Sequence, residues 1–434
     1  MGALVFVAAV TFAFALTLRG LPRRVGHFLL LAFLLQGVLI LSTDLLGVTL
    51  LPLLPDEINY HTYAIQFLET GRTPSGEFGA RLYSYLLSAV YRLTGPSMGV
   101  GRFLNGAISL SAIGVIYRVV QRYDTSPSTA GTVVVAFLTL LPTRIFYHTA
   151  LLRESIVFGF FVLAIYLIST SLAKRSRAGS VQFFALSVLA LVGVYLFRSE
   201  NMYVFGGVLL LLPLVSPRSL LSDRASGILA TLGVIAVVVG FQTVGVDQLI
   251  GDLNQFVGSM RPRSRLYDLG REYGSLLDVV LATPYRAVLY LIAPDPFSPS
   301  HYRFLLPTLS SAYIVTFLLA CLGIGLSAGR SPLARDALAS WREYRLTFIV
   351  LAVTCTVGIA FYSLAEPNFR VAPRHRLQFT WMFYTVLAMS LFQGRRLSIS
   401  GNGIRIRALT YRSRPREAAP RTEEGAPSRS PDDA

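Results

Sequence analysis

Charged residues are scarce in this sequence. They make up 14% of the 434 residues, whereas hydrophobic residues make up 53%, and the mean hydropathy is +0.57. Such a composition excludes a soluble globular protein. Apolar runs long enough to cross roughly 30 Å of hydrocarbon as helix recur along the whole chain. Because lipid cannot satisfy exposed backbone groups, we predict an all-α polytopic membrane protein.

Cysteine and histidine are also rare. Cys321 and Cys355 both fall inside apolar runs, which makes a disulfide framework or a cysteine metal site improbable. The five histidines lack a metal-ligand spacing such as HExxH, so we predict no metal site built from them. The formal net charge of +16 comes without a nucleic-acid recognition motif. It is typical of basic loops that meet anionic membrane lipid, and we expect membrane lipids, not nucleic acid, as partners.

Eleven apolar segments predict eleven transmembrane helices. They cover residues 2–18, 27–50, 100–121, 129–146, 152–173, 181–197, 202–216, 225–245, 305–326, 346–364 and 377–393. The first segment has no small-residue cleavage site after it, so we expect a retained helix and not a removed signal peptide. Residues 1–393 are therefore predicted to form a single transmembrane domain.

Basic residues assign the two sides of the membrane. They gather in "RGLPRRVG", "AKRSRAGS", "GRSPLARDALASWREYR" and the tail after Phe392. With eleven spans, all four segments fall on one side, which the positive-inside tendency makes cytoplasmic. We therefore predict a multi-pass plasma-membrane protein with its N-terminus outside and its C-terminus in the cytoplasm. The longest outer loops are then 51–99 and 246–304. The polar tail 394–434 lacks apolar periodicity and is predicted to be disordered.

The outer loop 51–99 carries two carboxylates directly after an apolar run. Asp56 and Glu57 open a predicted short helix over 57–68, on which Glu57 and His61 share a face. A second apolar but short segment, 80–94, is predicted to lie as a helix in the membrane interface. A simpler interpretation of the two carboxylates is that they solvate the loop and cap the helix at its positive end.

Further ionisable residues fall at predicted outer positions. Outer arginines oppose the positive-inside tendency and suit bidentate phosphate binding. Simpler interpretations stay open: an ion pair of Glu154 with Arg153, a solvated turn at Arg198, and a lipid-headgroup face for the arginines of "MRPRSR". The candidate residues on this side are Asp56, Glu57 and Glu154 as acids, with Tyr60, His61, Arg261, Arg263, Arg265, Arg374, His375 and Arg376 as substrate- or phosphate-binding groups.

The stretch "PDEINYHTYAIQFLETGRTP" and its continuation through Gly95 and Arg102 resemble a known family. It is similar to the first outer loop of polyprenyl-phosphate-dependent membrane glycosyltransferases of the GT-C superfold. Aminoarabinose transferases of lipid A and protein O-mannosyltransferases are the nearest named relatives. "RIFYHTALLRESIVFGFFVLAIYL" and "RHRLQFTWMFYTVLA" resemble later segments of the same family, and they place Glu154 and the basic residues Arg374 and Arg376.

The resemblance implies a function. Asp56, and less directly Glu57, would act as the general base, or would anchor a divalent metal, for the acceptor. Arg374 and Arg376 would hold the phosphate of the donor. We therefore expect a glycosyltransferase that moves a sugar from a polyprenyl-phosphate donor to a lipid, glycan or protein acceptor on the outer face. No cofactor is assigned, and a divalent metal is left open.

Two other functions fit the same residues. A polymerase of lipid-linked polysaccharide repeat units uses similar chemistry, and the long loop 246–304 suits it. A transporter or flippase of lipid-linked sugars would place its charged groups near the middle of the bilayer. The predicted spans are nearly free of charge and the ionisable groups lie at their outer ends, which favours chemistry at the membrane surface.

Overall fold

The fold is that of a computed structural model. It describes residues 2–45, 54–73, 76–122, 129–173, 177–201, 273–292, 305–328, 345–365, 372–392, 395–400 and 403–408, together with 204–205, 208, 250–251 and 254–255. The chain divides into two compact units, Met1–Gln393 and Gly394–Ala434, which we describe separately.

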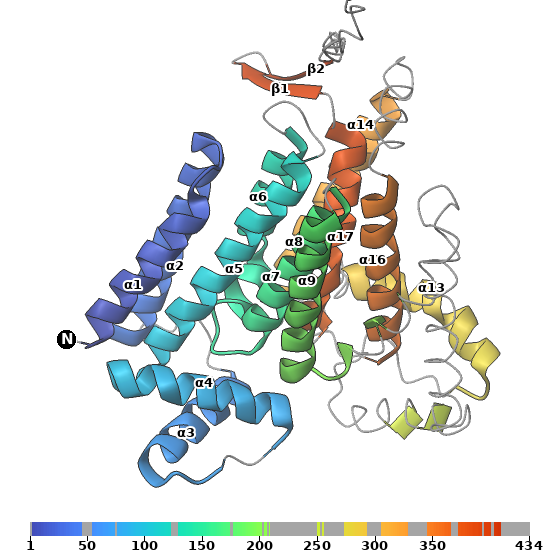
Figure 1. The fold of residues 1–434 in the computed structure, drawn as a ribbon. Coiled ribbons are helices and arrows are strands. Elements are labelled where there is room, and N and C mark those ends of the chain that lie inside the picture. The colour runs from blue at the N-terminus through green and yellow to red at the C-terminus, as the bar shows by residue number, and fades with distance from the viewer. Residues whose placement is uncertain are drawn as a thin grey trace, which may run out of the picture. The chain divides into compact units, whose positions relative to one another are not determined.

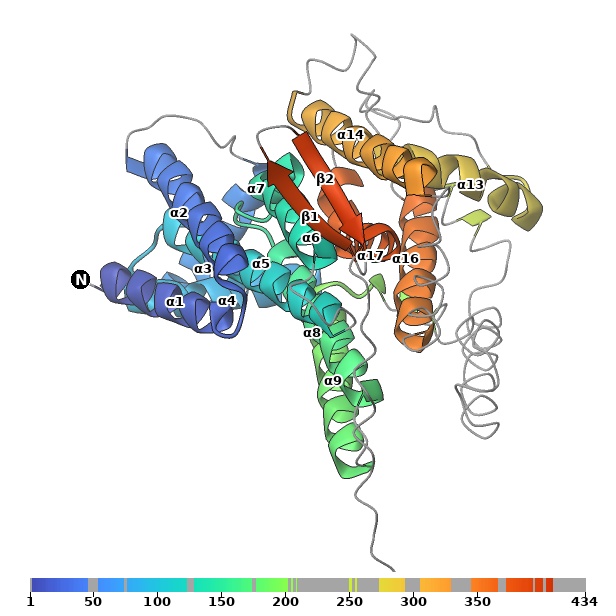
Figure 2. The ribbon, with the colours of Figure 1, turned by 90° about the horizontal axis from the view of Figure 1, so that it is seen from above.

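All regular secondary structure among the described residues of the first unit is helical. Its N-terminal half contains α1 (Gly2–Leu18), α2 (Arg23–Leu45), α5 (Met98–Gln121), α6 (Thr129–Leu140), α8 (Glu154–Ala173) and α9 (Arg177–Phe197). Its C-terminal part contains α13 (Leu276–Ile292), α14 (Leu305–Ala328), α16 (Arg345–Ala365) and α17 (Ala372–Phe392). Figures 1 and 2 show α1 and α2 at one flank, α13, α14 and α16 at the other, and α5, α8 and α17 between them.

Several of these helices suit a lipid bilayer. Three described segments are long and apolar enough to cross a membrane: Arg23–Asp44, Met98–Gln121 and Glu154–Ser171. Five shorter apolar helices accompany them: Gly2–Leu18, Thr129–Leu140, Val181–Phe197, Thr308–Gly323 and Phe348–Leu364. The chain therefore has the helices of a membrane protein, as the composition predicted. The count of eleven spans stays a prediction, because 202–216 and 225–245 lie almost wholly outside the described residues.

Two predicted segments differ from the structure. The span predicted over 129–146 is broken at Leu141, and a separate short helix, α7 (Pro142–Tyr147), follows it. Pro142 cannot donate a helical hydrogen bond and instead occupies the first turn of α7. The predicted outer loop 246–304 contains α13, a helix that the sequence did not suggest because Asp278, Pro284 and Arg286 interrupt its apolar pattern.

The two short helices predicted after α2 are present. Helix α3 (Pro55–Thr70) begins with Pro55 in its first turn and ends at Gly71, whose left-handed φ of 69° suits glycine. Helix α4 (Phe78–Thr94) buries Tyr83, Leu87 and Tyr91 on one face. It packs against α3, α9 and α1, and Figure 1 shows α3 and α4 at one end of the long helices.

Close packing of α4 on α9 depends on Gly79. A Cβ at this position would collide with the carbonyl oxygen of Phe197 and the guanidinium group of Arg153. Since neither the backbone of α9 nor a buried arginine can yield easily, glycine is required for this approach. Gly79 therefore fixes α4 beside the residues that form the candidate site.

The second unit contains a hairpin where the sequence predicted disorder. Strands β1 (Arg395–Ser400) and β2 (Gly403–Ala408) are antiparallel, and their register pairs Leu397 with Ile406 and Ile399 with Ile404. Apolar and polar residues alternate in both strands, which is the period of a β-strand. The structure thus gives these residues strands, and the disorder predicted for the tail stays a prediction, because the remainder of the tail lies outside the described residues.

Candidate active site

Glu57 forms a closed ion pair with Arg102. Its side chain is 0% exposed, and Arg102 on α5 reaches it with Nε at 3.0 Å from Oε1 and Nη2 at 3.2 Å from Oε2. The third nitrogen of the same guanidinium group, Nη1, donates to Asp44 Oδ1 at 3.3 Å. Such bidentate geometry is the strongest form of an arginine–carboxylate contact.

Two backbone amides complete the surroundings of Glu57. Leu54 N donates to Oε2 at 3.1 Å, which caps the start of α3, and Leu151 N donates to Oε1 at 2.6 Å. Each carboxylate oxygen thus accepts one backbone and one arginine hydrogen bond. This geometry favours a structural role for Glu57, which joins α3 and α5 to the turn before α8.

The turn over 148–153 is itself buried and held by side chains. Asn105 on α5 donates to Ala150 O at 2.6 Å and to Leu152 O at 2.8 Å. Ser155 donates to His148 O at 2.8 Å. Burial lowers the pKa of His148 to about 3, with a further contribution from Arg144. The turn therefore sets the position from which Glu154 begins α8.

Asp56 belongs to a second, more open cluster. Its carboxylate is 45% exposed and forms an ion pair with Arg374 Nη1. Arg374 also donates through Nε to Glu154 Oε1 at 2.6 Å, and Glu154 is fully buried. One guanidinium group, supplied by the first turn of α17, thus bridges a half-exposed carboxylate on α3 and a buried one on α8.

Arg198 and His375 adjoin the buried end of this bridge. Arg198, which follows α9, donates to Glu154 Oε1 at 3.2 Å and is 3% exposed. His375 Nε2 lies 3.9 Å from the same oxygen. Burial, with Arg198 and Arg374 nearby, holds the pKa of His375 well below its ordinary value. Burial opposes the charge of Arg374, but Glu154 and Asp56 outweigh it and raise the pKa of that guanidinium group.

A third arginine extends the cluster toward α4. Arg153 donates to both oxygens of Glu77, at 3.1 and 3.0 Å, and to Phe197 O at 3.0 Å. Tyr60 is buried, and the charges of Glu154, Arg153 and Arg374 act on its hydroxyl group. Its ring contacts Tyr83 edge-on, with centroids 5.0 Å apart. Tyr60 thus packs α3 against α4 close to the cluster.

The other predicted residues lie elsewhere. His61 forms a hydrogen bond through Nδ1 with the hydroxyl group of Tyr91, at 2.8 Å. Arg376 is buried and donates to the carbonyl oxygens of Tyr290 and Leu291, at 3.2 and 2.7 Å, at the end of α13. That geometry favours a structural role instead of phosphate binding. Arg261, Arg263 and Arg265 lie outside the described residues.

The site also contains residues that the sequence did not single out. Arg198 was expected in a solvated turn because "FRSEN" is polar, yet it is buried against Glu154. No sequence pattern singles out Glu77, and Arg153, for which a pair with Glu154 was one open interpretation, binds Glu77 instead. An arginine that follows an apolar run directly, as Arg198 follows Phe197, is the one local signal that pointed to burial.

The chemistry of the cluster follows from the difference between its two carboxylates. Glu154 is buried and binds the guanidinium groups of Arg198 and Arg374, whereas the carboxylate of Asp56 is 45% exposed. A metal ion at Asp56 would have to sit next to that guanidinium charge. The part of the chain that the structure describes contains no group of three or more His, Cys, Asp or Glu side chains able to hold one. The described residues around Asp56 therefore do not fit a metal ion.

Comparisons with known proteins identify no family for this chain. No protein-family model matches the sequence, and no curated protein matches it. The class of the protein therefore rests on its helices and on the geometry of this cluster.

Proposed function

We propose that the protein is a membrane glycosyltransferase that moves a sugar from a polyprenyl-phosphate donor to an acceptor hydroxyl on the outer membrane face. The proposal includes a GT-C-like fold, which the resemblance implied, and about eleven spans, which the apolar runs predicted. It rests most on one observation, the pairing of the half-exposed Asp56 with Arg374 at the end of the helices where α3 and α4 lie.

The pairing supplies two groups that such a transfer needs. The acceptor hydroxyl must lose a proton, and a nearby carboxylate can take it. The leaving phosphate gathers negative charge, which a fixed cation stabilises. Asp56 and Arg374 provide a base and a cation in direct contact, and Glu154 with Arg198 fixes the cation from the buried side.

The proposed step is a single displacement. The acceptor oxygen attacks the anomeric carbon, the bond from that carbon to the phosphate oxygen breaks, and the configuration inverts. The proton of the acceptor passes to Asp56, and polyprenyl phosphate leaves with the electron pair. Binding of the donor phosphate to Arg374 would loosen its contact with Asp56, which frees the carboxylate to face the acceptor.

Donor turnover tests the proposal. Purified protein is incubated with radiolabelled polyprenyl-phosphate sugars, and label leaving the lipid fraction is followed. Asp56→Asn keeps the shape of the side chain but cannot accept a proton as a carboxylate does, so transfer should fall by about 10²–10⁴-fold. Full transfer by Asp56→Asn would remove the catalytic assignment. Transfer onto a second lipid-linked sugar would instead favour the polymerase, and movement of intact donor between leaflets would favour the transporter.

The proposal also requires that Asp56 lie on the outer side of the membrane. Thr73 is exposed between α3 and α4, and Ser176 lies between α8 and α9 in the sequence. A cysteine at position 73 should react with an impermeant thiol reagent in intact cells, whereas one at position 176 should not. The reverse pattern would place Asp56 in the cytoplasm and exclude transfer at the outer face.

A further inference from the structure

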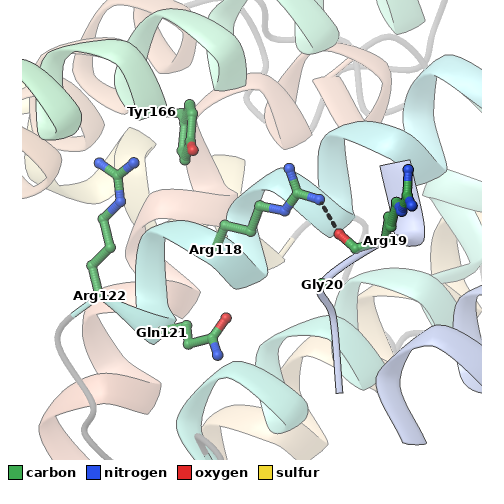
Figure 3. A pocket seen from close by; sticks show the side chains of 6 residues that line it. All are labelled: Arg19, Gly20, Arg118, Gln121, Arg122 and Tyr166. Carbon is green, nitrogen blue, oxygen red and sulfur yellow. Dashed lines mark hydrogen bonds between the residues drawn. The ribbon is translucent and has the colours of Figure 1, made fainter. Parts of the chain in front are cut away.

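A second group of arginines lies at the opposite end of the helices from α3 and α4. Helix α5 begins shortly after α4 and ends at Gln121, and α1 ends at the turn that leads to α2. The C-terminal ends of α1 and α5 are therefore remote from Asp56. Figure 3 shows the open pocket there, lined by Arg19, Gly20, Arg118, Gln121, Arg122 and Tyr166. None of these six residues is acidic.

Local interactions build the pocket. Gly20 takes a left-handed φ of 82°, which makes the turn between α1 and α2 tight. Arg118 Nη2 donates to Thr17 O at 2.9 Å and to Arg19 O at 2.7 Å, which ties the end of α5 to that turn. The guanidinium carbon of Arg122 lies 4.3 Å from the centre of the Tyr166 ring, a cation–π contact with α8.

A structural explanation accounts for only part of this charge. Arg118 satisfies the last carbonyl groups of α1, and basic residues in general gather at cytoplasmic helix ends. Arg19, in contrast, is exposed, and Nη1 of Arg122 is buried without a hydrogen-bond partner among the described residues. A buried donor without a partner carries a desolvation cost, which an anion bound beside the same guanidinium group would offset.

From these observations we infer that the pocket binds a phosphate group through Arg19, Arg118 and Arg122. Arginine forks match the oxygen atoms of phosphate, and three arginines line this one open pocket. The phosphate would belong to an anionic lipid headgroup or to a soluble phosphate compound, since both present the same oxygens at the predicted cytoplasmic surface. The inference does not depend on the proposed transferase activity.

Two binding measurements test the inference and distinguish the two sources. In the first, purified protein is mixed with phosphatidic acid or phosphatidylcholine, and retained lipid is counted by native mass spectrometry. In the second, inorganic pyrophosphate is titrated in detergent by calorimetry. The variant is Arg19→Gln/Arg122→Gln. The matched control is Arg24→Gln. It removes an exposed charge near the start of α2, from a residue that does not line the pocket.

We expect the wild-type protein and Arg24→Gln to bind at least about tenfold more tightly than the double variant. Selective loss of phosphatidic acid identifies a lipid headgroup, and selective loss of pyrophosphate identifies a soluble compound. Equal binding by all three proteins would overturn the inference. If the double variant does not fold, Arg122→Lys serves instead. It keeps the charge but lacks the fork, and its affinity should fall while that of Arg24→Lys does not.

Discussion

Asp56 and Glu57 are neighbours in the chain and each pairs with an arginine, yet the two pairs differ in nearly every physical respect. Glu57 is fully buried, and each of its oxygens accepts two hydrogen bonds. Asp56 is 45% exposed and contacts one nitrogen of Arg374. Successive residues on a helix point about 100° apart, so the first turn of α3 directs one carboxylate into the protein and leaves the other at its surface.

Because of this difference, the Glu57 pair suits a role in stability and the Asp56 pair suits a role in chemistry. A saturated, buried pair cannot take a proton or release its arginine without leaving an uncompensated charge. A half-exposed pair contributes little to stability and can exchange partners with a ligand. We therefore propose Asp56 alone, and not Glu57, for the catalytic role expected of these two carboxylates.

The largest expected effect is the loss of folding free energy when the buried pair of Glu57 and Arg102 is broken. Glu57→Gln leaves the buried Arg102 without its main partner, which should cost about 3–5 kcal/mol of folding free energy. Thermal unfolding of the purified protein would show this as a much lower Tm. Glu69→Gln, at an exposed position of the same helix, is the control and should leave the Tm unchanged. A wild-type Tm for Glu57→Gln would mean that the pair is not structural.

A smaller effect, on donor binding, is expected when Arg374, the cation paired with Asp56, is replaced. Arg374→Gln should raise the donor KM by roughly ten- to hundredfold, since a charge-assisted contact to phosphate is worth about 1.5–3 kcal/mol. Arg376→Gln removes contacts to Tyr290 and Leu291 instead, and should lower the Tm with little change in KM. Steady-state kinetics with varied donor decides between them. A KM effect from Arg376→Gln alone would reverse the assignment.

The turn that supports the closed pair should also respond to pH. His148 has a pKa of about 3 when folded, below that of an unfolded histidine. The unfolded chain therefore binds the proton first, and stability is lost as pH falls from about 6.5 toward 3, by about 2 kcal/mol at pH 5. His148→Gln should flatten this fall in Tm, whereas His27→Gln, at an exposed position, should not. An equally steep fall in His148→Gln would contradict the prediction.

The smallest effect expected is that of Asp56→Asn on stability. The ion pair with Arg374 is partly solvated, and such pairs contribute roughly 0–1 kcal/mol. The Tm of Asp56→Asn should therefore stay close to that of the wild type while transfer is lost. If Asp56→Asn were as unstable as Glu57→Gln, the two carboxylates would not differ as the structure indicates.

Much of the helical arrangement could be predicted from the sequence. Long apolar runs located α1, α5, α8, α14 and α16 to within a few residues, because hydrophobicity and length decide which segments suit a membrane. The break at Pro142 and the helix α13 could not be predicted in this way. Tertiary packing holds α13 despite the polar residues in it, and hydropathy gives no account of such packing.

The site could be predicted in composition but not in detail. Asp56, Glu154, Arg374 and His375 were expected on one face, and the structure brings them together. Which carboxylate faces inward depends on the contact of α3 with the turn 148–153, which no local pattern encodes. The solvated turn predicted for Arg198 missed its burial, because its partner Glu154 lies 44 residues away in the sequence.

The contact between Asp56 and Arg374 joins residues 318 positions apart, which bears on how the protein is made. During synthesis α3 and α8 leave the ribosome long before α17 exists. Until then Glu154 has Arg198 available but not Arg374, and Asp56 has no arginine from α17. The site is therefore among the last features to form. A chain that stops before residue 374 would lack the guanidinium group that joins Asp56 to Glu154.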